Sequence, residues 1–353
     1  MELSTNELAI FAGVDVHKKS WEVQLMSRHV CLKRFHMTEP SPKKLSDYLQ
    51  QKYPGKKHFC VYEAGFCGFW IYEELEKLGI QTIIVNPGDV PTTDKEKRTK
   101  TDKIDCKKLA TGLASGLMSG IHIPPKQQQK DRSLVRQRYQ YATDERRMKN
   151  RIKAHLNFYG LKIDDIQSTG HWSNRYIEEL EKMATQQDDL VLEGYLMKLR
   201  IERRMGLTLL RRVRQLSKSE RYSHEFSLLN SIPGVGLLTI MVYLTEIGDI
   251  QRFKKDDHYI SYIGFVPTIQ ASGNKEYRGG LSKRGNKRLR TALVLSSWMA
   301  IRNDNELLSY YEKCKSNGKH SNVAIIKVAR KLALIMKAIL RDNKPYKRAF
   351  SEV

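Results

Sequence analysis

Blocks of apolar residues near the start of the chain predict an ordered series of strands and helices. Residues 9–16 (AIFAGVDV) are apolar almost throughout, which is typical of a buried strand. The elements expected next, after a polar H-K-K-S turn, are strands at 21–26 and 30–37, a helix at 42–53, a strand at 58–65, a helix near 71–79 and a strand at 82–86. Three successive strands followed by alternating helices and strands are the order of a ribonuclease-H-like α/β fold.

The pattern changes after a basic connector at 91–108, a small-residue helix at 108–120 and I-H-I-P-P. Apolar residues then recur at spacings of 7, 7, 4, 4 and 3, which marks one face of a long helix of the kind found in coiled coils: Leu134, Tyr141, Met148, Ile152, Leu156 and Tyr159. A second long helix is expected over 190–216. We interpret 126–222 as a helical arm between an α/β domain, 1–125, and a mostly helical domain, 223–353.

The stretch 226–245 carries no charge and is nearly long enough to cross a bilayer. Asn230, Ser231 and the P-G-V-G run interrupt it, so a turn feeding a buried helix is expected and a membrane span is not. Beyond it we expect a helix at 237–248, a polar loop at 266–286 and two final helices at 288–303 and 322–342.

Charge indicates the partner. The 353 residues carry 62 Lys and Arg against 39 Asp and Glu, a net charge of +23, which favours a polyanion such as nucleic acid but does not by itself indicate an enzyme. Five cysteines without a C-x-x-C pair argue against a disulfide framework or a structural zinc site. With no secretory signal at the amino terminus, we expect a cytoplasmic, nucleoid-associated protein of a bacterium or archaeon.

Four carboxylates form the candidate catalytic set. Asp15 lies within the first apolar strand, Glu63 near the end of the fourth, and Asp102 and Asp105 three apart on one expected helix face. In a ribonuclease-H-like sheet these positions converge, and two Mg²⁺ ions about 4 Å apart would neutralise them and assist in-line phosphoryl displacement. The alternative for Asp102 and Asp105 is ordinary surface ion pairs with neighbouring lysines, and for Glu63 a turn residue, but an unpaired Asp within an apolar strand is costly.

Candidate phosphate contacts gather in the last domain. Gly234 and Gly236 of P-G-V-G resemble the turn of a helix-hairpin-helix, although a plain helix–helix turn fits as well. Ser272, followed by glycine in a cationic loop, is a candidate nucleophile on phosphorus, the alternative being a phosphate-contacting turn. The surrounding cations are Lys275, Arg278, Lys283, Arg284, Lys287 and Arg288.

The arm is basic as well. Residues 126–153 hold ten Lys or Arg against three acids, and 200–214 add six Arg. A solvated charged face is the common explanation for such runs, but the excess of one sign favours contact with a nucleic-acid backbone, for which Arg146, Arg147 and Arg151 are candidates.

Together these motifs resemble the insertion sequence 110 family of transposases, which includes the Piv-type DNA invertases. G-V-D-V-H-K, Y-E-A-G and T-D-x-x-D resemble its amino-terminal DEDD domain. The run I-P-G-V-G, T-E-I-G-D, F-K-K-D, Y-I-G-F-V-P, S-G and S-K-R-G-N resembles its second domain. The resemblance implies a RuvC-like domain in which Asp15, Glu63, Asp102 and Asp105 bind Mg²⁺, and Ser272 as a nucleophile that forms a covalent phosphoserine.

The resemblance also implies partners. They are donor and target DNA, a non-coding bridge RNA that pairs with both, and a homodimer that assembles into a tetramer whose sites join the carboxylates of one subunit to the serine of another. Two alternatives remain open. One is a RuvC-like structure-specific endonuclease that uses water as nucleophile, and the other is a nucleic-acid-binding scaffold without activity.

Overall fold

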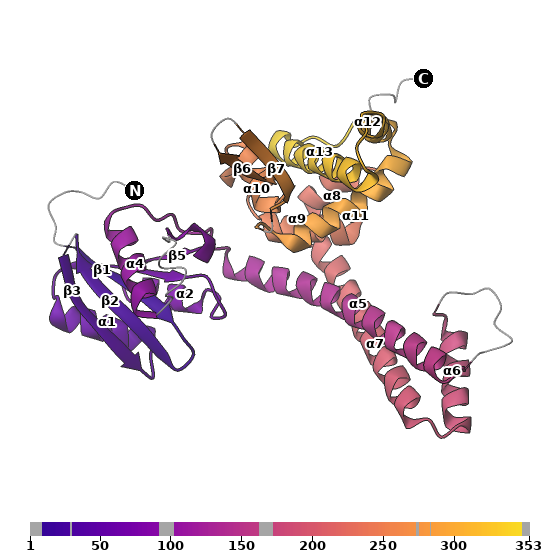
Figure 1. Ribbon diagram of the computed structural model, residues 1–353, viewed down its shortest axis with the longest axis horizontal. Helices are drawn as coiled ribbons and strands as arrows, with labels where there is room; N and C mark the ends of the chain where they lie inside the picture. The colour runs from indigo at the N-terminus through magenta and orange to yellow at the C-terminus, as the bar shows by residue number, and fades with distance from the viewer. Residues whose placement is uncertain are drawn as a thin grey trace. The chain divides into compact units, whose positions relative to one another are not determined.

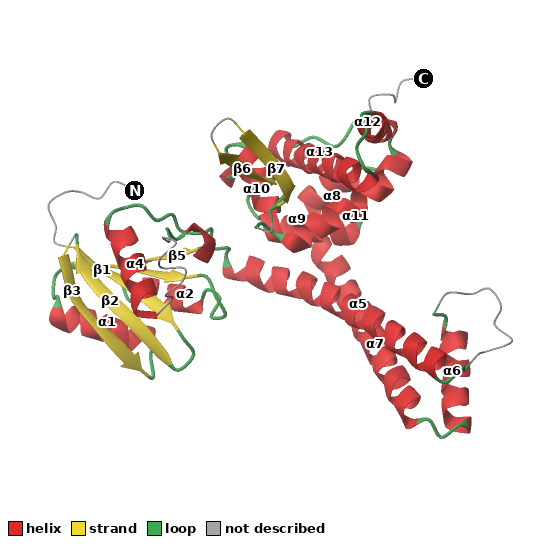
Figure 2. Cartoon of the chain, viewed as in Figure 1, coloured by secondary structure: helices red, strands yellow, loops and turns green. Residues whose placement is uncertain are grey.

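The chain forms two compact units, Met1–Ile123 and Pro124–Val353 (Figure 1). The structure is a computed structural model that describes residues 9–28, 30–91, 102–161, 172–272, 275–282 and 284–347. The first unit combines a sheet with helices, and the second is mostly helical (Figure 2).

The first unit is built on a mixed five-stranded sheet of order β3-β2-β1-β4-β5. The antiparallel part consists of β1 (Ala9–Val16), β2 (Ser20–Ser27) and β3 (Val30–Thr38). β4 (Lys57–Glu63) lies parallel to β1, and β5 (Gln81–Val85) parallel to β4. The predicted order of strands is confirmed, and the first strand has the predicted bounds.

Alternation along the strands gives this sheet two apolar faces. Even-numbered residues such as Ile10 and Ala12 share a core with Leu45 of α1 (Pro42–Lys52) and Leu75 of α2 (Trp70–Lys77). Ser41 caps α1, because its side chain accepts a hydrogen bond from the backbone of Lys44, as expected of Ser followed by Pro. A short 3₁₀ turn, η1 (Pro87–Asp89), follows β5.

The opposite face is covered by α4 (Asp102–Ala114), a helix that begins earlier and ends sooner than the small-residue pattern predicts. Phe11, Phe59 and Ala110 share one small core there. A Cβ at Gly13 would lie 2.3 Å from both the backbone nitrogen of Ala110 and the carbonyl oxygen of Cys106. Only glycine permits this approach, so the G in G-V-D-V determines how closely α4 lies on β1.

The second unit begins with the predicted helical hairpin. α5 (Lys126–Phe158) packs along α7 (Leu190–Ser217), and an additional helix, α6 (Asn174–Gln186), precedes α7. Met148, Ile152 and Leu156 are buried as predicted, whereas Tyr159 is 62% exposed. Tyr159 follows the last residue of α5, so the predicted apolar face ends one turn early.

The remaining elements pack around α9 (Leu237–Ile247), which is buried on nearly all sides. They are α8 (Ser223–Asn230), η2 (Ile250–Arg252), α10 (Asp256–Ile263), β6 (Pro267–Ser272), β7 (Lys275–Leu281), α11 (Lys287–Asn303), α12 (Asn305–Ser316) and α13 (Ser321–Asp342). The prediction of a loop over 266–286 is wrong: β6 and β7 pair there as an antiparallel hairpin. Across the described parts of both units, none of the helices has the length and apolar character needed to cross a bilayer.

Candidate active site

The register of the sheet brings Asp15 and Glu63 together. β1 and β4 run parallel with Val14 opposite Tyr62, so the next residues, Asp15 and Glu63, lie side by side at the ends of both strands. Neighbouring strands are about 4.8 Å apart, and residues in register point to the same face. That face is the one covered by α4, because Phe11, Phe59 and Val61 on it pack against that helix. Both carboxylates are half-buried.

The direction of α4 carries its first turn toward the same edge. Ala110 lies near Phe11, and Cys106 lies over Gly13, so the helix runs opposite to β1 and its amino-terminal end approaches Asp15. Asp102 is the first residue of this helix, one turn before Cys106. Its side chain is outside the described part of the chain, as are residues 92–101.

The other carboxylate of this helix has a basic neighbour. Asp105 Oδ1 lies 3.7 Å from Lys108 Nζ, and both side chains are largely buried, at 17% and 13% exposure. The backbone therefore brings Asp15, Glu63 and the first turn of α4, which carries Asp105, to one edge of the sheet. The described side chains at this edge do not include that of Asp102. Among them, no group of three or more His, Cys, Asp or Glu lies close enough together to hold a metal ion. The donor chemistry nevertheless fits, because carboxylate oxygens are what hard divalent cations bind.

Sequence reasoning missed two groups at this edge. Glu22 lies opposite Asp15 in the β1–β2 register, and its Oε1 is 2.6 Å from His36 Nδ1. His17 Nε2 lies 3.3 Å from Asp15 Oδ2. The available signal was the alternation of 21–26: Trp21, Val23 and Leu25 fill one core, so Glu22 must point to the other face, beside Asp15.

The pKa of Cys106 reflects the negative charge at this edge. Burial, together with the carboxylates of Glu22 and Asp15, which oppose a further negative charge, raises the pKa of the Cys106 thiol to about 11. Cys106 therefore stays a neutral thiol at physiological pH. The acidic edge is a place where a cation is favoured and an additional anion is not.

In the second unit, Ser272 is the last residue of β6 and pairs in register with Lys275, the first of β7. The turn between them, 273–274, lies outside the described residues, as do Lys283 and the side chains of Ser272, Lys275 and Arg278. The base of the hairpin is held by backbone bonds, with Ser282 N donating to Val266 O at 2.9 Å. Ser272 is thus carried at the tip of a hairpin that is anchored at its base.

A buried hub of hydrogen bonds is centred on Glu246 of α9. Glu246 of T-E-I-G-D is 2% exposed and receives two hydrogen bonds from Arg136 of α5, at 2.6 and 2.8 Å. Asn286, the N-cap of α11, donates to Glu246 Oε2 at 2.7 Å and accepts from Leu289 N. Burial raises the pKa of Glu246, but Arg136, Arg132 and Asn286 together outweigh it and hold the pKa below its usual value. The hub joins the arm to the S-K-R-G-N segment.

The two glycines of P-G-V-G differ. Gly234 has a φ of +80°, and a Cβ there would lie 2.5 Å from the backbone nitrogen of Ala300, so this glycine permits a close approach to α11. Gly236 is exposed, with open space where a Cβ would be, and it is the N-cap of α9. Of the pair, only Gly236 presents accessible backbone at a helix start.

The remaining predicted cations are on the surface. Arg284, Lys287 and Arg288 are exposed near the start of α11. On α5, Arg146, Arg147 and Arg151 are exposed, and Arg147 Nη1 lies 3.0 Å from Asp144 Oδ1. The described cations of both groups are accessible to a large anionic partner.

Comparison with known proteins gives a consistent result for both units. Residues 12–161 match the DEDD transposase family of IS110 elements, described as "Transposase", and residues 226–312 match the family described as "Transposase IS116/IS110/IS902 family". The two matches contain the strand with Asp15, the helix with Asp105 and the hairpin with Ser272.

Several curated proteins are similar over most of the chain. The transposase for insertion sequence element IS1111A of Coxiella burnetii is 28% identical over 301 residues, covering 81% of this chain and 79% of that protein. The transposase for insertion sequence element IS1533 of Leptospira borgpetersenii is 24% identical over 300 residues, covering 82% and 84%. The pilin gene-inverting protein of Moraxella bovis is 32% identical over 134 residues, covering 37% and 41%.

Proposed function

Because the chain belongs to the IS110 family of transposases, we propose that it cleaves and rejoins DNA strands by phosphoryl transfer, with Ser272 as nucleophile. The observation that carries this proposal is the register of β1 and β4, which sets Asp15 beside Glu63 under the first turn of α4. The similarity to transposases and to a pilin gene-inverting protein supports DNA as the substrate.

The carboxylates are assigned by position. Asp15, Glu63, Asp102 and Asp105 would hold Mg²⁺, two ions in the proposed arrangement, and the bound ions supply charge stabilisation to the attacking and leaving oxygens. The chain itself positions the groups at this edge. Gly13 permits the close packing of α4 on β1, and His36 orients Glu22 through a hydrogen bond. We assign the unit a ribonuclease-H-like, RuvC-related fold from its strand order.

The proposed reaction has two balanced steps. In the first, the Ser272 oxygen bonds to phosphorus and releases its proton to solvent, while the bond from phosphorus to a deoxyribose oxygen breaks and that oxygen takes up a proton. In the second, the hydroxyl of another strand attacks the phosphoserine, which restores the serine and rejoins the DNA. No bond energy is lost to hydrolysis, so strands are exchanged without an external energy source.

The experiment is to trap the intermediate. A labelled DNA substrate incubated with protein and Mg²⁺ should give a covalent adduct, and mass spectrometry should place the phosphate on Ser272. The Ser272→Ala variant should form no adduct, whereas Ser282→Ala, which alters a neighbouring hydroxyl that accepts from Arg284 N, should form it. An adduct on another residue would refute the assignment.

The alternative is a RuvC-like endonuclease that uses water, favoured by the fact that the acidic edge belongs to one unit by itself. It predicts hydrolysed ends, no adduct and full cleavage by Ser272→Ala. Removal of Mg²⁺ with a chelator abolishes activity under both mechanisms, so this control separates either enzyme from an inactive scaffold.

The partners remain part of the proposal. We propose that a bridge RNA binds through exposed cations such as Arg146 and Arg151 of α5. Sequencing the RNA that copurifies with the protein tests this, and a random set of cellular RNA would contradict it.

The proposed homodimer and tetramer can be tested by mixing subunits. Asp15→Asn and Ser272→Ala are each inactive alone under the proposed mechanism. If one copy supplies the carboxylates and another the serine, a mixture of the two variants regains activity, because one composite site in each mixed dimer is intact. A mixture that stays inactive would mean that each copy uses its own residues.

A further inference from the structure

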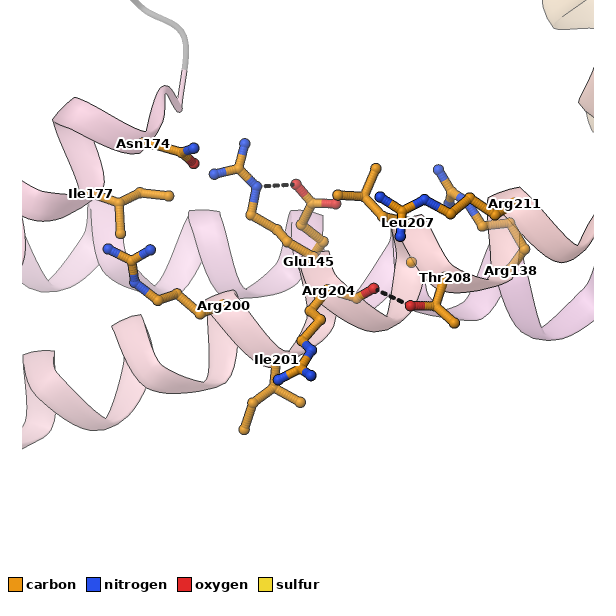
Figure 3. A pocket seen from close by; sticks show the side chains of 12 residues that line it. Arg138, Glu145, Asn174, Ile177, Arg200, Ile201, Arg204, Leu207, Thr208 and Arg211 are labelled. Atoms are coloured by element: carbon orange, nitrogen blue, oxygen red, sulfur yellow. Dashed lines mark hydrogen bonds and ion pairs between the residues drawn. The ribbon is translucent and has the colours of Figure 1, made fainter.

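The arm contains a groove that none of the predicted site residues lines. It has a volume of about 810 Å³ and lies between α5, α6 and α7 (Figure 3). Arginine dominates its lining. Among the described lining residues, Arg138, Arg200, Arg203, Arg204 and Arg211 accompany one acid, Glu145, and the others are Asn174, Ile177, Ile201, Gly206, Leu207 and Thr208. The groove is therefore strongly cationic over its whole length.

Two of these arginines have partners within the protein. Arg203 lies 3.5 Å from Glu145 and donates to the backbone oxygen of Trp172 at 2.8 Å. Arg200 pairs with Glu181, with its Nη2 2.6 Å from Oε2. These bonds orient two guanidinium groups at the end of the groove next to Ile177.

Three arginines have no acidic partner within the described ranges. Arg204 and Arg211 are exposed on α7, and Arg138 lies on α5 near Arg211 (Figure 3). The Nε of Arg138 is buried, yet it has no hydrogen-bond acceptor in the described structure. A buried donor left unpaired is unfavourable in the free protein.

The lining indicates what kind of anion binds. Guanidinium groups match phosphate oxygens with two parallel hydrogen bonds. Sites for single strands combine such cations with aromatic rings on which bases stack, and the described lining residues include no aromatic side chain. From Arg200 to Arg211 the helix rises about 16 Å, which equals the axial rise of roughly five base pairs of a duplex.

We propose that this groove binds the phosphodiester backbone of double-helical nucleic acid, with Arg138, Arg204 and Arg211 as the principal contacts. The proposal rests on the proposed function for the class of ligand, but it concerns a binding site separate from the acidic edge and from Ser272. The groove holds a duplex by its backbone and leaves base recognition to other parts of the complex.

The test is binding of full-length protein to fluorescent 20-base-pair duplexes in metal-free buffer, measured against salt concentration. The double variant Arg204→Gln/Arg211→Gln removes two phosphate contacts, so the log–log salt slope should fall by about two. Affinity near 0.1 M salt should fall on the order of tens of fold. The matched control, Lys198→Gln/Arg212→Gln, removes two exposed charges from the same helix outside the groove and should change affinity by about twofold at most.

The arms of the experiment are duplex DNA, duplex RNA and single strands of each. Loss with either duplex or with both supports the groove and shows which source it serves. An equal loss for groove and control variants overturns the proposal, as does a loss that is as large for single strands. Ser272→Ala separates the two proposals. This variant should form no adduct but keep the normal salt slope of duplex binding, so the groove and the serine mechanism can be refuted independently.

A second variant has the opposite sign. Glu145→Gln removes the one acid among the described lining residues and releases Arg203 and Lys149, so duplex affinity should rise by several fold. Glu193→Gln, an acid on α7 that does not line the groove, is the control and should leave affinity unchanged. Weaker duplex binding by Glu145→Gln than by this control would contradict the groove.

Discussion

The two charged surfaces of this chain, the acidic edge of the first unit and the arginine-lined groove of the second, carry charges of opposite sign and differ in their surroundings. In the first unit, a few carboxylates lie at the end of a sheet whose neighbouring positions are fully buried. In the second, arginines are numerous, long and mostly exposed along α5 and α7. A charged side chain within a buried strand costs free energy unless it is paired or binds a ligand. A charged side chain on a helix surface is solvated and carries no such cost. The acidic site can therefore be recognised because carboxylates next to buried strand residues are rare. The basic site can be recognised only from which arginines lie together in space.

The largest effect we expect is on activity. Asp15→Asn removes the carboxylate at the centre of the acidic edge and should lower strand cleavage by about a thousandfold or more, since such charge stabilisation is worth several kcal/mol. Asp47→Asn alters an exposed carboxylate of α1 in the same unit and should have no effect. Cleavage assays on both variants test this, and unchanged cleavage by Asp15→Asn would end the assignment of the edge.

The next effect concerns the stability of the second unit. Glu246→Ala leaves Arg136 without its buried partner and should cost about 3–5 kcal/mol of unfolding free energy. Denaturant unfolding measures this, and hydrogen exchange should place the loss in α5, α9 and the start of α11 while the first unit is unaffected. Loss of protection in both units alike would show that they do not unfold independently.

The same carboxylate predicts a pH dependence. The pKa of Glu246 is lower in the folded protein than in the unfolded chain, so its stabilisation is present above the unfolded pKa, about 4.3, and is lost as pH falls through the folded value. The difference in stability between wild type and Glu246→Gln should shrink with acid in that window. A constant difference would mean that the charge of Glu246 is not what stabilises the hub.

A smaller effect distinguishes two glycines. Gly13→Ala places a methyl group 2.3 Å from backbone atoms of α4 and should destabilise the first unit by about 1–3 kcal/mol, with loss of activity as α4 shifts. Gly194→Ala lies in α7 with open space around it and should stabilise the arm by about 0.5–1 kcal/mol. Thermal unfolding of both variants tests the contrast, and equal effects would refute the close contact.

The smallest effect is on thiol reactivity. Cys31 is exposed and should react readily with a thiol reagent at pH 8, whereas burial raises the pKa of Cys60 to about 12 and that of Cys106 to about 11. Cys106 in the first unit and buried Cys314 in the second should react only when their units open. Their separate rates, followed by mass spectrometry, compare the opening of the two units directly. Rapid reaction of Cys106 would mean that α4 is not seated on the sheet.

The sequence by itself determined the order of strands in the first unit and the long helices of the second. These depend on local patterns of apolar residues, which are visible without any long-range contact. It also pointed to Asp15 and Glu63, because an acid next to a run of buried residues is conspicuous in a linear pattern.

Tertiary structure alone decided which distant residues share a site. The pairing of Glu22 with His36 beside Asp15 depends on strand register, and the hub at Glu246 depends on helices more than a hundred residues apart in the chain. The β6–β7 hairpin was missed because its residues are polar and rich in glycine, so its pattern resembles a loop until the two strands pair. Among the many arginines of the arm, only the packing of α5, α6 and α7 selects the few that line one groove, because neighbours across a helical interface are not neighbours in sequence.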